Sequence, residues 1–152
     1  MSNGRLGHGD EEDVRLTRRV EAPWGSRPVT VAAAFQHSLA LTEAGALFRW
    51  GQGQSGRLGH GHEDDLLVPC RVASLEGVVV FTAAAGCYHS LAIYAAGRVY
   101  SFGYGGNGQL GHGSTSHELL PRRVEGALAT VRVTSAAAGH GHSIVACREG
   151  QL

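Results

Sequence analysis

Short apolar runs alternate with glycine-rich polar stretches along the whole chain. In the run that follows His37, Leu39 and Leu41 share one face at a period of two, which is the side-chain period of a β-strand. No segment keeps the period of about 3.6 residues that marks an amphipathic helix. The pattern therefore predicts an all-β protein built from short antiparallel strands.

The predicted strands follow the same order in successive parts of the chain. A strand rich in small residues comes first, then a strand that opens with His-Ser, then a turn with glycine and a strand that ends in an aromatic residue. The predicted strands cover residues 29–34, 37–41 and 47–50, then 78–82, 89–93 and 99–102, and finally 131–134 and 142–145.

A glycine-rich hexapeptide sets the register of this order. It occurs as Gly4–Gly9, Gly56–Gly61 and Gly108–Gly113, so its starts lie 52 residues apart. A fixed long period indicates a repeat architecture, and an all-β unit of this size is typical of a propeller blade. We therefore expect one repeat domain over residues 1–152, with units at 4–55, 56–107 and 108–152, the last of them cut short.

The residues that recur are interpreted as framework. A loop that doubles back needs positive φ or close backbone approach, and glycine supplies both. A phosphate cradle is the alternative, but the loop lacks G-K-[ST] and recurs in every unit, whereas a ligand loop is usually unique. The positions assigned to the framework are Gly56, Leu58, Gly59, Gly61, Gly86, His89, Ser90, Gly108, Leu110, Gly111, Gly113, Gly139 and His142.

Three histidines, His37, His89 and His142, each precede a serine and a short apolar strand. We expect each ring to be half-buried and to form hydrogen bonds across a blade junction. A catalytic role would need a unique nucleophile beside the ring, and the sequence shows none.

Two H-x-H pairs, His60–His62 and His140–His142, have a spacing that can chelate zinc, and Glu63–Asp65 adjoin the first pair. Because His60 and His142 belong to the repeat, we interpret the spacing as incidental. We expect no metal and no cofactor.

Charge and cysteine content narrow the function classes. The 13 basic and 13 acidic side chains give a net charge of zero, which argues against nucleic-acid binding. Three widely spaced cysteines indicate a reducing compartment, and Cys87 and Cys147 are expected to be buried, inert thiols. No signal peptide or membrane-spanning run is visible, so we expect an intracellular protein, cytoplasmic or nuclear, without a membrane partner.

Three elements together resemble the repeat signature of the regulator of chromosome condensation family. They are A-A-A-G-x-x-H-S-L-A-I at Ala83–Ile93, W-G-x-G at Trp50–Gly53, and the stretch Asn107–Gly113. The resemblance covers almost the whole chain, although Ala34 stands where Gly86 and Gly139 stand. The family fold is a seven-bladed propeller, so the resemblance implies a partial β-propeller of about three blades with two open edges.

Fold alone does not settle function on such a scaffold. We expect a non-catalytic protein-interaction module, a fragment or a part of a larger protein. The loops after each hexapeptide differ between units and are the candidate partner-binding residues. They comprise Asp10, Glu11, Glu12, Asp13, His62, Glu63, Asp64, Asp65, Ser114, Thr115, His117 and Glu118.

Other functions of the family are alternatives. Guanine-nucleotide exchange on a Ran-like small GTPase would need a protruding wedge, and the even 52-residue spacing leaves no room for one. A substrate-recruiting propeller of a HECT-type ubiquitin ligase would place the ligase outside this chain. Ultraviolet sensing is disfavoured because Trp24 and Trp50 are the only tryptophans and G-W-R-H-T is absent. The open edges also predict self-association.

Overall fold

The computed structural model describes residues 3–148, in which ten strands form three antiparallel sheets. The first sheet contains β1 (Pro28–Ala33), β2 (His37–Thr42), β3 (Leu47–Gly51) and β4 (Leu66–Arg71). The second contains β5 (Val80–Ala85), β6 (His89–Tyr94), β7 (Val99–Gly103) and β8 (Glu118–Arg123), and the third β9 (Val133–Ala138) and β10 (Ser143–Cys147). The strands of each sheet are hydrogen-bonded in sequence order.

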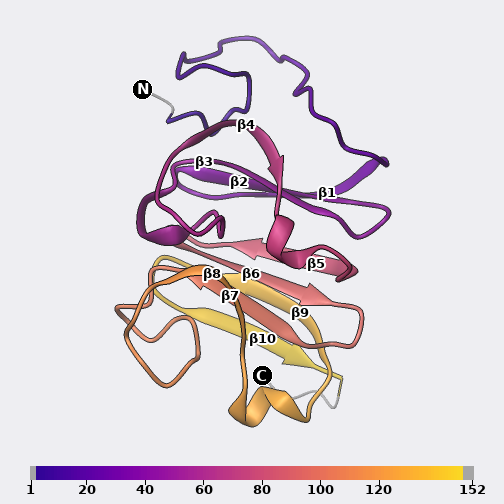
Figure 1. Cartoon of the computed structure of the whole chain (residues 1–152), viewed down its shortest axis with the longest axis vertical. Coiled ribbons are helices and arrows are strands. Elements are labelled where there is room, and N and C mark those ends of the chain that lie inside the picture. The colour runs from indigo at the N-terminus through magenta and orange to yellow at the C-terminus, as the bar shows by residue number, and fades with distance from the viewer. Residues whose placement is uncertain (1–2, 149–152) are drawn as a thin grey trace.

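The sheets are stacked one on the next from the N-terminal to the C-terminal end of the chain (Figure 1). This confirms the predicted all-β fold with about three propeller blades. Three short 3-10 turns, η1 (Gln54–Gly56), η2 (Ala73–Leu75) and η3 (Gly126–Ala129), join the strands. None of the helical turns in residues 3–148 has the length and apolar character needed to cross a bilayer.

The second and third hexapeptides lie within the sequence of a sheet rather than at its start. Gly56–Gly61 connects β3 to β4, and Gly108–Gly113 connects β7 to β8. The sheets are therefore offset from the 52-residue units. By the same period residues 14–19 correspond to β4, yet they form no strand and Leu16 is 83% exposed. In residues 3–148 they have no equivalent of β3 to pair with.

Apolar side chains fill the two spaces between successive sheets. Aliphatic residues dominate both clusters, because stacked sheets bury one face of each strand. Between the first and second sheets lie Leu39, Leu41, Leu47, Val72, Leu75, Val80, Ala92 and Phe102. Between the second and third lie Ala84, Leu91, Ile93, Val99, Val124 and Val133. Cys87 and Cys147 are half-buried, so the expectation that both thiols are buried was wrong.

The N-terminal segment covers the outer face of the first sheet. Trp24 packs edge-on against Phe48 at a centroid distance of 4.9 Å. The Trp50 Nε1–H donates to the Arg5 carbonyl oxygen at 2.8 Å. The first hexapeptide thus occupies, against the first sheet, the place that the second hexapeptide occupies against the second.

A serine hydroxyl joins the first sheet to the second. The Ser90 hydroxyl donates to the Arg57 carbonyl oxygen at 2.9 Å, and the His37 Nε2 lies 2.9 Å from the same Oγ. Since the single hydroxyl proton is given to the carbonyl, the ring must be the donor, so His37 carries its proton on Nε2. One group of the second sheet is therefore held by two groups of the first.

The same arrangement recurs at the next junction. Ser143 donates to the Gln109 carbonyl oxygen at 2.8 Å and lies 2.8 Å from the His89 Nε2. Ser38 makes one of the two hydrogen bonds: its hydroxyl donates to the Arg5 carbonyl oxygen at 2.9 Å. His37 and His89 are fully buried rather than half-buried, while His142 is exposed.

Two glycines of the second hexapeptide show why the loop needs this residue. Gly59 has φ of 68°, and a Cβ there would lie 2.8 Å from the Phe102 ring. A Cβ at Gly56, where φ is 75°, would lie 2.7 Å from the Leu119 Cα. Both contacts are closer than packing allows, so the hexapeptide of one sheet lies directly against the third and fourth strands of the next.

Removing the Ser90 hydroxyl tests the junction. Ser90→Ala leaves the His37 Nε2–H and the Arg57 carbonyl buried without these partners, so we expect it to lower the free energy of unfolding by about 2–4 kcal/mol. The matched variant Ser38→Ala removes one half-exposed bond and should cost about 1 kcal/mol. Urea denaturation of both variants measures the difference, and equal losses would contradict the proposed role of the junction.

The buried histidines predict acid sensitivity. Burial, with the nearby Arg57 charge, lowers the pKa of His37 to about 3, and burial lowers that of His89 to about 4. Unfolded histidines take up protons near pH 6.5 while these rings stay neutral, so stability is full above that pH and falls below it. The loss should approach about 1.4 kcal/mol per pH unit for each ring, down to the folded pKa.

Denaturation between pH 7 and pH 4.5 checks this expectation. His37→Gln keeps an amide N–H for Ser90 but does not titrate, so its stability should fall less steeply with acid than that of the unmodified protein. Parallel pH profiles for the two proteins would show that His37 does not contribute.

Candidate functional site

The turns that join the first two strands of each sheet have a constant backbone and variable tips. In each turn the residue before the tip donates its backbone N–H to the carbonyl of the histidine after it, at 2.9–3.0 Å. The two tip residues differ every time: Phe35-Gln36, Cys87-Tyr88 and His140-Gly141. We call the surface that these three pairs form, together with the β3–β4 and β7–β8 loops, the loop face.

Two hollows lie on the loop face and adjoin at His140. A shallow depression of about 370 Å³ borders Phe35, Cys87 and His140 at the ends of β1, β5 and β9. A second cavity of about 290 Å³ is lined by Gln54, Ser55, Arg57, Tyr88, Tyr104, Asn107 and His140. The second, which we call the Tyr88 pocket, joins side chains from all three sheets.

Tyr88 is the centre of this pocket. Its ring lies 5.1 Å from the His140 ring and 6.1 Å from the Tyr104 ring, both edge-on. The Arg57 guanidinium carbon lies 5.0 Å from the Tyr88 ring centroid, a cation–π distance. The Tyr104 backbone N–H donates to the Tyr88 carbonyl oxygen at 2.9 Å, which fixes the two loops together.

The loops proposed from sequence contain several groups that stabilise their own backbone. Asp65 accepts a hydrogen bond from the Gly53 N–H at 2.8 Å, and Glu63 accepts one from the Ser55 N–H at 2.7 Å. At the position equivalent to Asp65, the His117 Nδ1 accepts from the Gly105 N–H at 3.2 Å. These three side chains therefore have a structural function in the loops that follow β3 and β7.

The remaining candidates lie on the surface. His62 is within 3.0 Å of an Asp64 oxygen, and Glu118 pairs with Arg122. Residues 114–118 are largely exposed, and so are residues 11–13. Three of the candidates adjoin the Tyr88 pocket. Asp65 and Glu63 brace the loop that carries Arg57, and the His117 ring lies 4.6 Å from the ring of Tyr104 in the pocket wall.

The first H-x-H pair shows a ring contact. The rings of His60 and His62 lie 3.8 Å apart, and the His60 Nε2–H donates to the Asp64 carbonyl oxygen at 2.9 Å. Burial lowers the pKa of His60. No group of three or more metal-ligating side chains occurs among residues 3–148.

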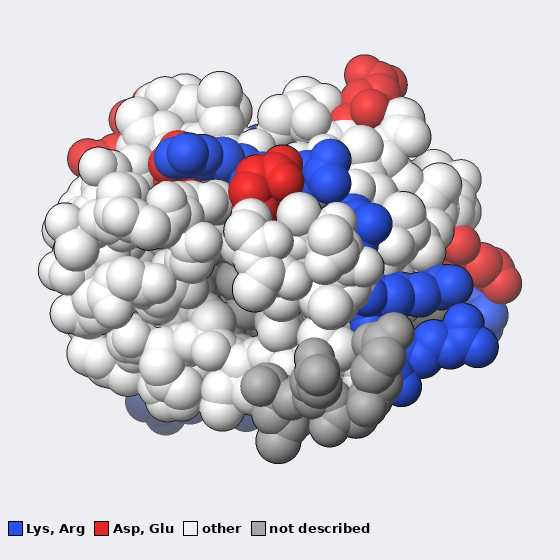
Figure 2. Space-filling model, turned by 90° about the horizontal axis from the view of Figure 1, so that it is seen from below, with Lys and Arg blue, Asp and Glu red and all other residues white. Residues whose placement is uncertain are grey.

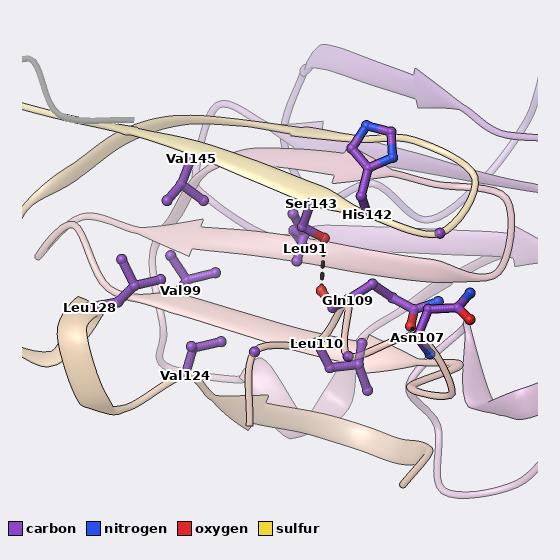
Figure 3. A pocket seen from close by; sticks show the side chains of 13 residues that line it. Leu91, Val99, Asn107, Gln109, Leu110, Val124, Leu128, His142, Ser143 and Val145 are labelled. Carbon is purple, nitrogen blue, oxygen red and sulfur yellow. Dashed lines mark hydrogen bonds between the residues drawn. The ribbon is translucent and has the colours of Figure 1, made fainter. Parts of the chain in front are cut away.

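A third concave site lies beside the third sheet, which has two strands in residues 3–148. It measures about 290 Å³, and Leu91, Val99, Val124, Leu128 and Val145 form its apolar part. Figure 3 shows these side chains converging beneath β10, with the Ser143–Gln109 hydrogen bond at the other end and the His142 ring turned away. At the junction between the first and second sheets, the Phe102 ring lies against Gly59. At the equivalent Gly111, the nearest side chain is that of Val124, which would lie 3.3 Å from a Cβ placed on Gly111. Within residues 3–148 the third sheet has no strand equivalent to β7, which supplies Phe102 at the matching position of the second sheet.

Comparison with known protein families shows which family this chain belongs to. The profile of the regulator of chromosome condensation (RCC1) repeat matches residues 44–93 and 96–146. The chain belongs to the RCC1 repeat family. Each matched repeat contains one His-Ser pair, His89-Ser90 in the first and His142-Ser143 in the second.

Relatives of this RCC1-repeat chain are longer proteins. It is 37% identical over 150 residues to the ultraviolet-B receptor UVR8 of Arabidopsis thaliana, covering 99% of this chain and 34% of that protein. It is also 37% identical over 151 residues to the human E3 ubiquitin-protein ligase HERC2, covering 98% of this chain and 3% of that protein. The chain thus spans about a third or less of these relatives.

Solved structures show the same fold. Prp20p of Saccharomyces cerevisiae superposes with a TM-score of 0.86 at 23% identity, over 95% of this chain and 37% of that one. Human WBSCR16 superposes with a TM-score of 0.83 at 28% identity, over 98% of this chain and 39% of that one. The sheets of this RCC1-repeat chain are therefore arranged as in longer propeller proteins.

Sequence reasoning missed the Tyr88 pocket. The sequence patterns assign no role to Arg57, and Tyr88 is an unspecified position in the motif A-A-A-G-x-x-H-S-L-A-I. A signal was available, because the two residues before each His-Ser pair change in every unit while their neighbours repeat. Residues that vary between fixed positions are where a repeat protein can acquire specificity.

Proposed function

We propose that this chain is a non-catalytic protein-interaction module that binds its partner with the loop face. The observation that carries the proposal is the contrast between constant turn backbones and tip pairs that differ in every sheet. Phe35 is 59% exposed at one tip, beside a hollow, and exposed aromatic side chains next to concave surface are typical of protein-binding sites.

The buried polar groups support a framework without chemistry of its own. His37 and His89 are each engaged by a serine of the next sheet, and neither has a nucleophile that is free to react. The three stretches after the hexapeptides, residues 10–13, 62–65 and 114–118, are proposed as a secondary contact zone, since their exposed side chains differ between sheets.

Two family functions remain alternatives with less support. The likeness to Prp20p, whose structure report describes binding to Gsp1p and histones, shows the fold alone at 23% identity. A nucleotide-release assay with a Ran-like GTPase tests exchange, and we expect no stimulation. Recruitment of substrates to a ubiquitin ligase would use the same loop face, with this chain as one part of a longer protein.

Affinity capture with matched variants tests the use of the loop face. The tip variant Phe35→Ala/His140→Ala removes two exposed rings and should reduce recovery of the true partner about tenfold or more. The control Val68→Ala/Leu120→Ala removes side chains of comparable exposure, 45% and 50%, from β4 and β8 and should leave recovery unchanged. Quantitative mass spectrometry of the captured proteins gives both ratios.

The pattern across the two variants decides the outcome. A partner lost with the tip variant and retained with the control supports the loop face. If every reproducible partner is retained by the tip variant and lost with the control, binding takes place on the outer strands and the proposed site is wrong.

The free edge of β10 also favours self-association. No strand pairs with β10 on its outer side within residues 3–148, and Ile144 on this strand is 50% exposed. Viewed toward the third sheet, much of the surface lacks charged side chains, which gather along the upper and right margins (Figure 2). An unpaired strand edge with few charges is a template for another chain.

Sedimentation equilibrium measures this tendency. We expect the average mass to rise above the 15.9 kDa of one chain as concentration increases from about 1 μM to about 1 mM. Ile144→Lys should suppress the rise because a charge on an edge strand opposes pairing, whereas Leu120→Lys, equally exposed on β8, should not. A constant monomer mass would exclude association through this edge.

A further inference from the structure

The junction between the first and second sheets differs from its equivalents in the side chains around the Tyr88 pocket. Its hexapeptide has arginine in second position, its turn tip ends in tyrosine, and tyrosine follows β7. One unit earlier, the residues equivalent to Arg57, Tyr88 and Tyr104 are Arg5, Gln36 and Gln52. One unit later, the residues equivalent to Arg57 and Tyr88 are Gln109 and Gly141. Arginine itself recurs, since Arg5 makes the equivalent hydrogen bond to the Phe35 carbonyl oxygen. Its combination with two tyrosines is found once, so the framework does not require that combination.

Arg57 is a buried cation without a carboxylate partner. Its side chain is fully buried, and no ion pair joins it to an acidic group among residues 3–148. It donates only to neutral oxygens: from Nε to the Gln54 carbonyl at 2.8 Å, and from Nη1 to the Cys87 carbonyl at 3.2 Å and the Gln36 Oε1 at 3.4 Å. Nη2 has no hydrogen-bond partner.

The cost of such an arrangement is high. A buried charge is normally paired, and a guanidinium left with unused donors loses part of its hydration without replacement. Burial lowers the pKa of Arg57, which reflects the same penalty. Asp65 and Glu63 are close enough to act on it through space, but each already accepts a backbone N–H.

The wall of the pocket supplies donors and no acid. Tyr88, Tyr104, Asn107, Ser55 and Gln54 present hydroxyl and amide groups, and His140 adds a ring. A cavity of about 290 Å³ can hold the end of one side chain. A cation beneath a ring of donors, with carboxylates kept outside, is complementary to a negatively charged oxygen group.

We propose that the Tyr88 pocket binds an oxyanion carried on a partner protein, namely the carboxylate of an acidic side chain or the phosphate of a phosphorylated one. Arg57 supplies the charge, and Tyr88 and Tyr104 form the walls between which the group enters. The nature of the carrier as a protein rests on the proposed function, whereas the anion preference rests on the pocket itself.

Short peptides test the anion preference directly. The probes are three blocked pentapeptides that differ only in the central residue, which is glutamate, phosphoserine or glutamine, added to the isotope-labelled full chain. We expect the two anionic peptides to shift the resonances of Tyr88, Tyr104 and Asn107 with a dissociation constant of about 1 mM or tighter. The glutamine peptide should bind at least about tenfold more weakly. The anionic peptide that binds more tightly shows whether the oxyanion is a carboxylate or a phosphate.

A repeat-matched substitution isolates the role of Arg57. Arg57→Gln converts the second hexapeptide into the sequence of the third, Gly-Gln-Leu-Gly-His-Gly, and keeps the backbone carbonyl that receives the Ser90 hydroxyl. It should abolish the preference for anionic peptides, whereas the equivalent Arg5→Gln should retain it. If Arg57→Gln proves unfolded, Asn107→Ala, an exposed residue of the same wall, should weaken the anionic peptides at least about threefold.

The outcomes separate this inference from the proposed function. Equal binding of glutamate and glutamine peptides, or an unchanged preference in folded Arg57→Gln, overturns the oxyanion site even if partner capture depends on Phe35 and His140. Anion-selective binding lost in Arg57→Gln supports the site even if no partner depends on those tips.

Discussion

The structure depends on a serine hydroxyl that two groups of the neighbouring sheet hold at once. Ser90 lies between the His37 ring and the Arg57 carbonyl, and Ser143 between the His89 ring and the Gln109 carbonyl. Apolar packing brings the sheets together but permits sliding, because dispersion and burial are not directional. A hydroxyl with one proton and a fixed acceptor defines a single offset between sheets. The neutral state of both rings is the condition for this arrangement, and burial maintains it.

The same arrangement explains how much of the fold the sequence could predict. The His-Ser pairs and the strands with a two-residue period follow from local chemistry, and the second and third strands of the first two sheets lie where they were predicted. The sequence could not show that Gly56–Gly61 connects the third strand of a sheet to the fourth, because a period fixes spacing and leaves the starting point open. It also could not show that the strand at 78–82 begins only at Val80.

The site was harder to predict than the fold for a physical reason. Arg57 and Tyr88 lie on different sheets, and only the stacking of one sheet on the next brings the guanidinium over the ring. The acidic stretch His62–Asp65 is a candidate from the sequence because its charge and its variation between units are visible there. Its Glu63 and Asp65 instead accept N–H groups of the preceding glycine-rich loop, a function that His117 takes over in the next sheet.

One residue links the framework to the proposed site. The Arg57 carbonyl receives the Ser90 hydroxyl, while its side chain lines the Tyr88 pocket. Because the joint uses the backbone, the side chain at this position can change without loss of the joint, and Gln109 shows this at the next junction. Because backbone atoms form the joint, the side chain at the second position of each hexapeptide is available for recognition. Specificity can then arise at one junction while every junction keeps the same geometry.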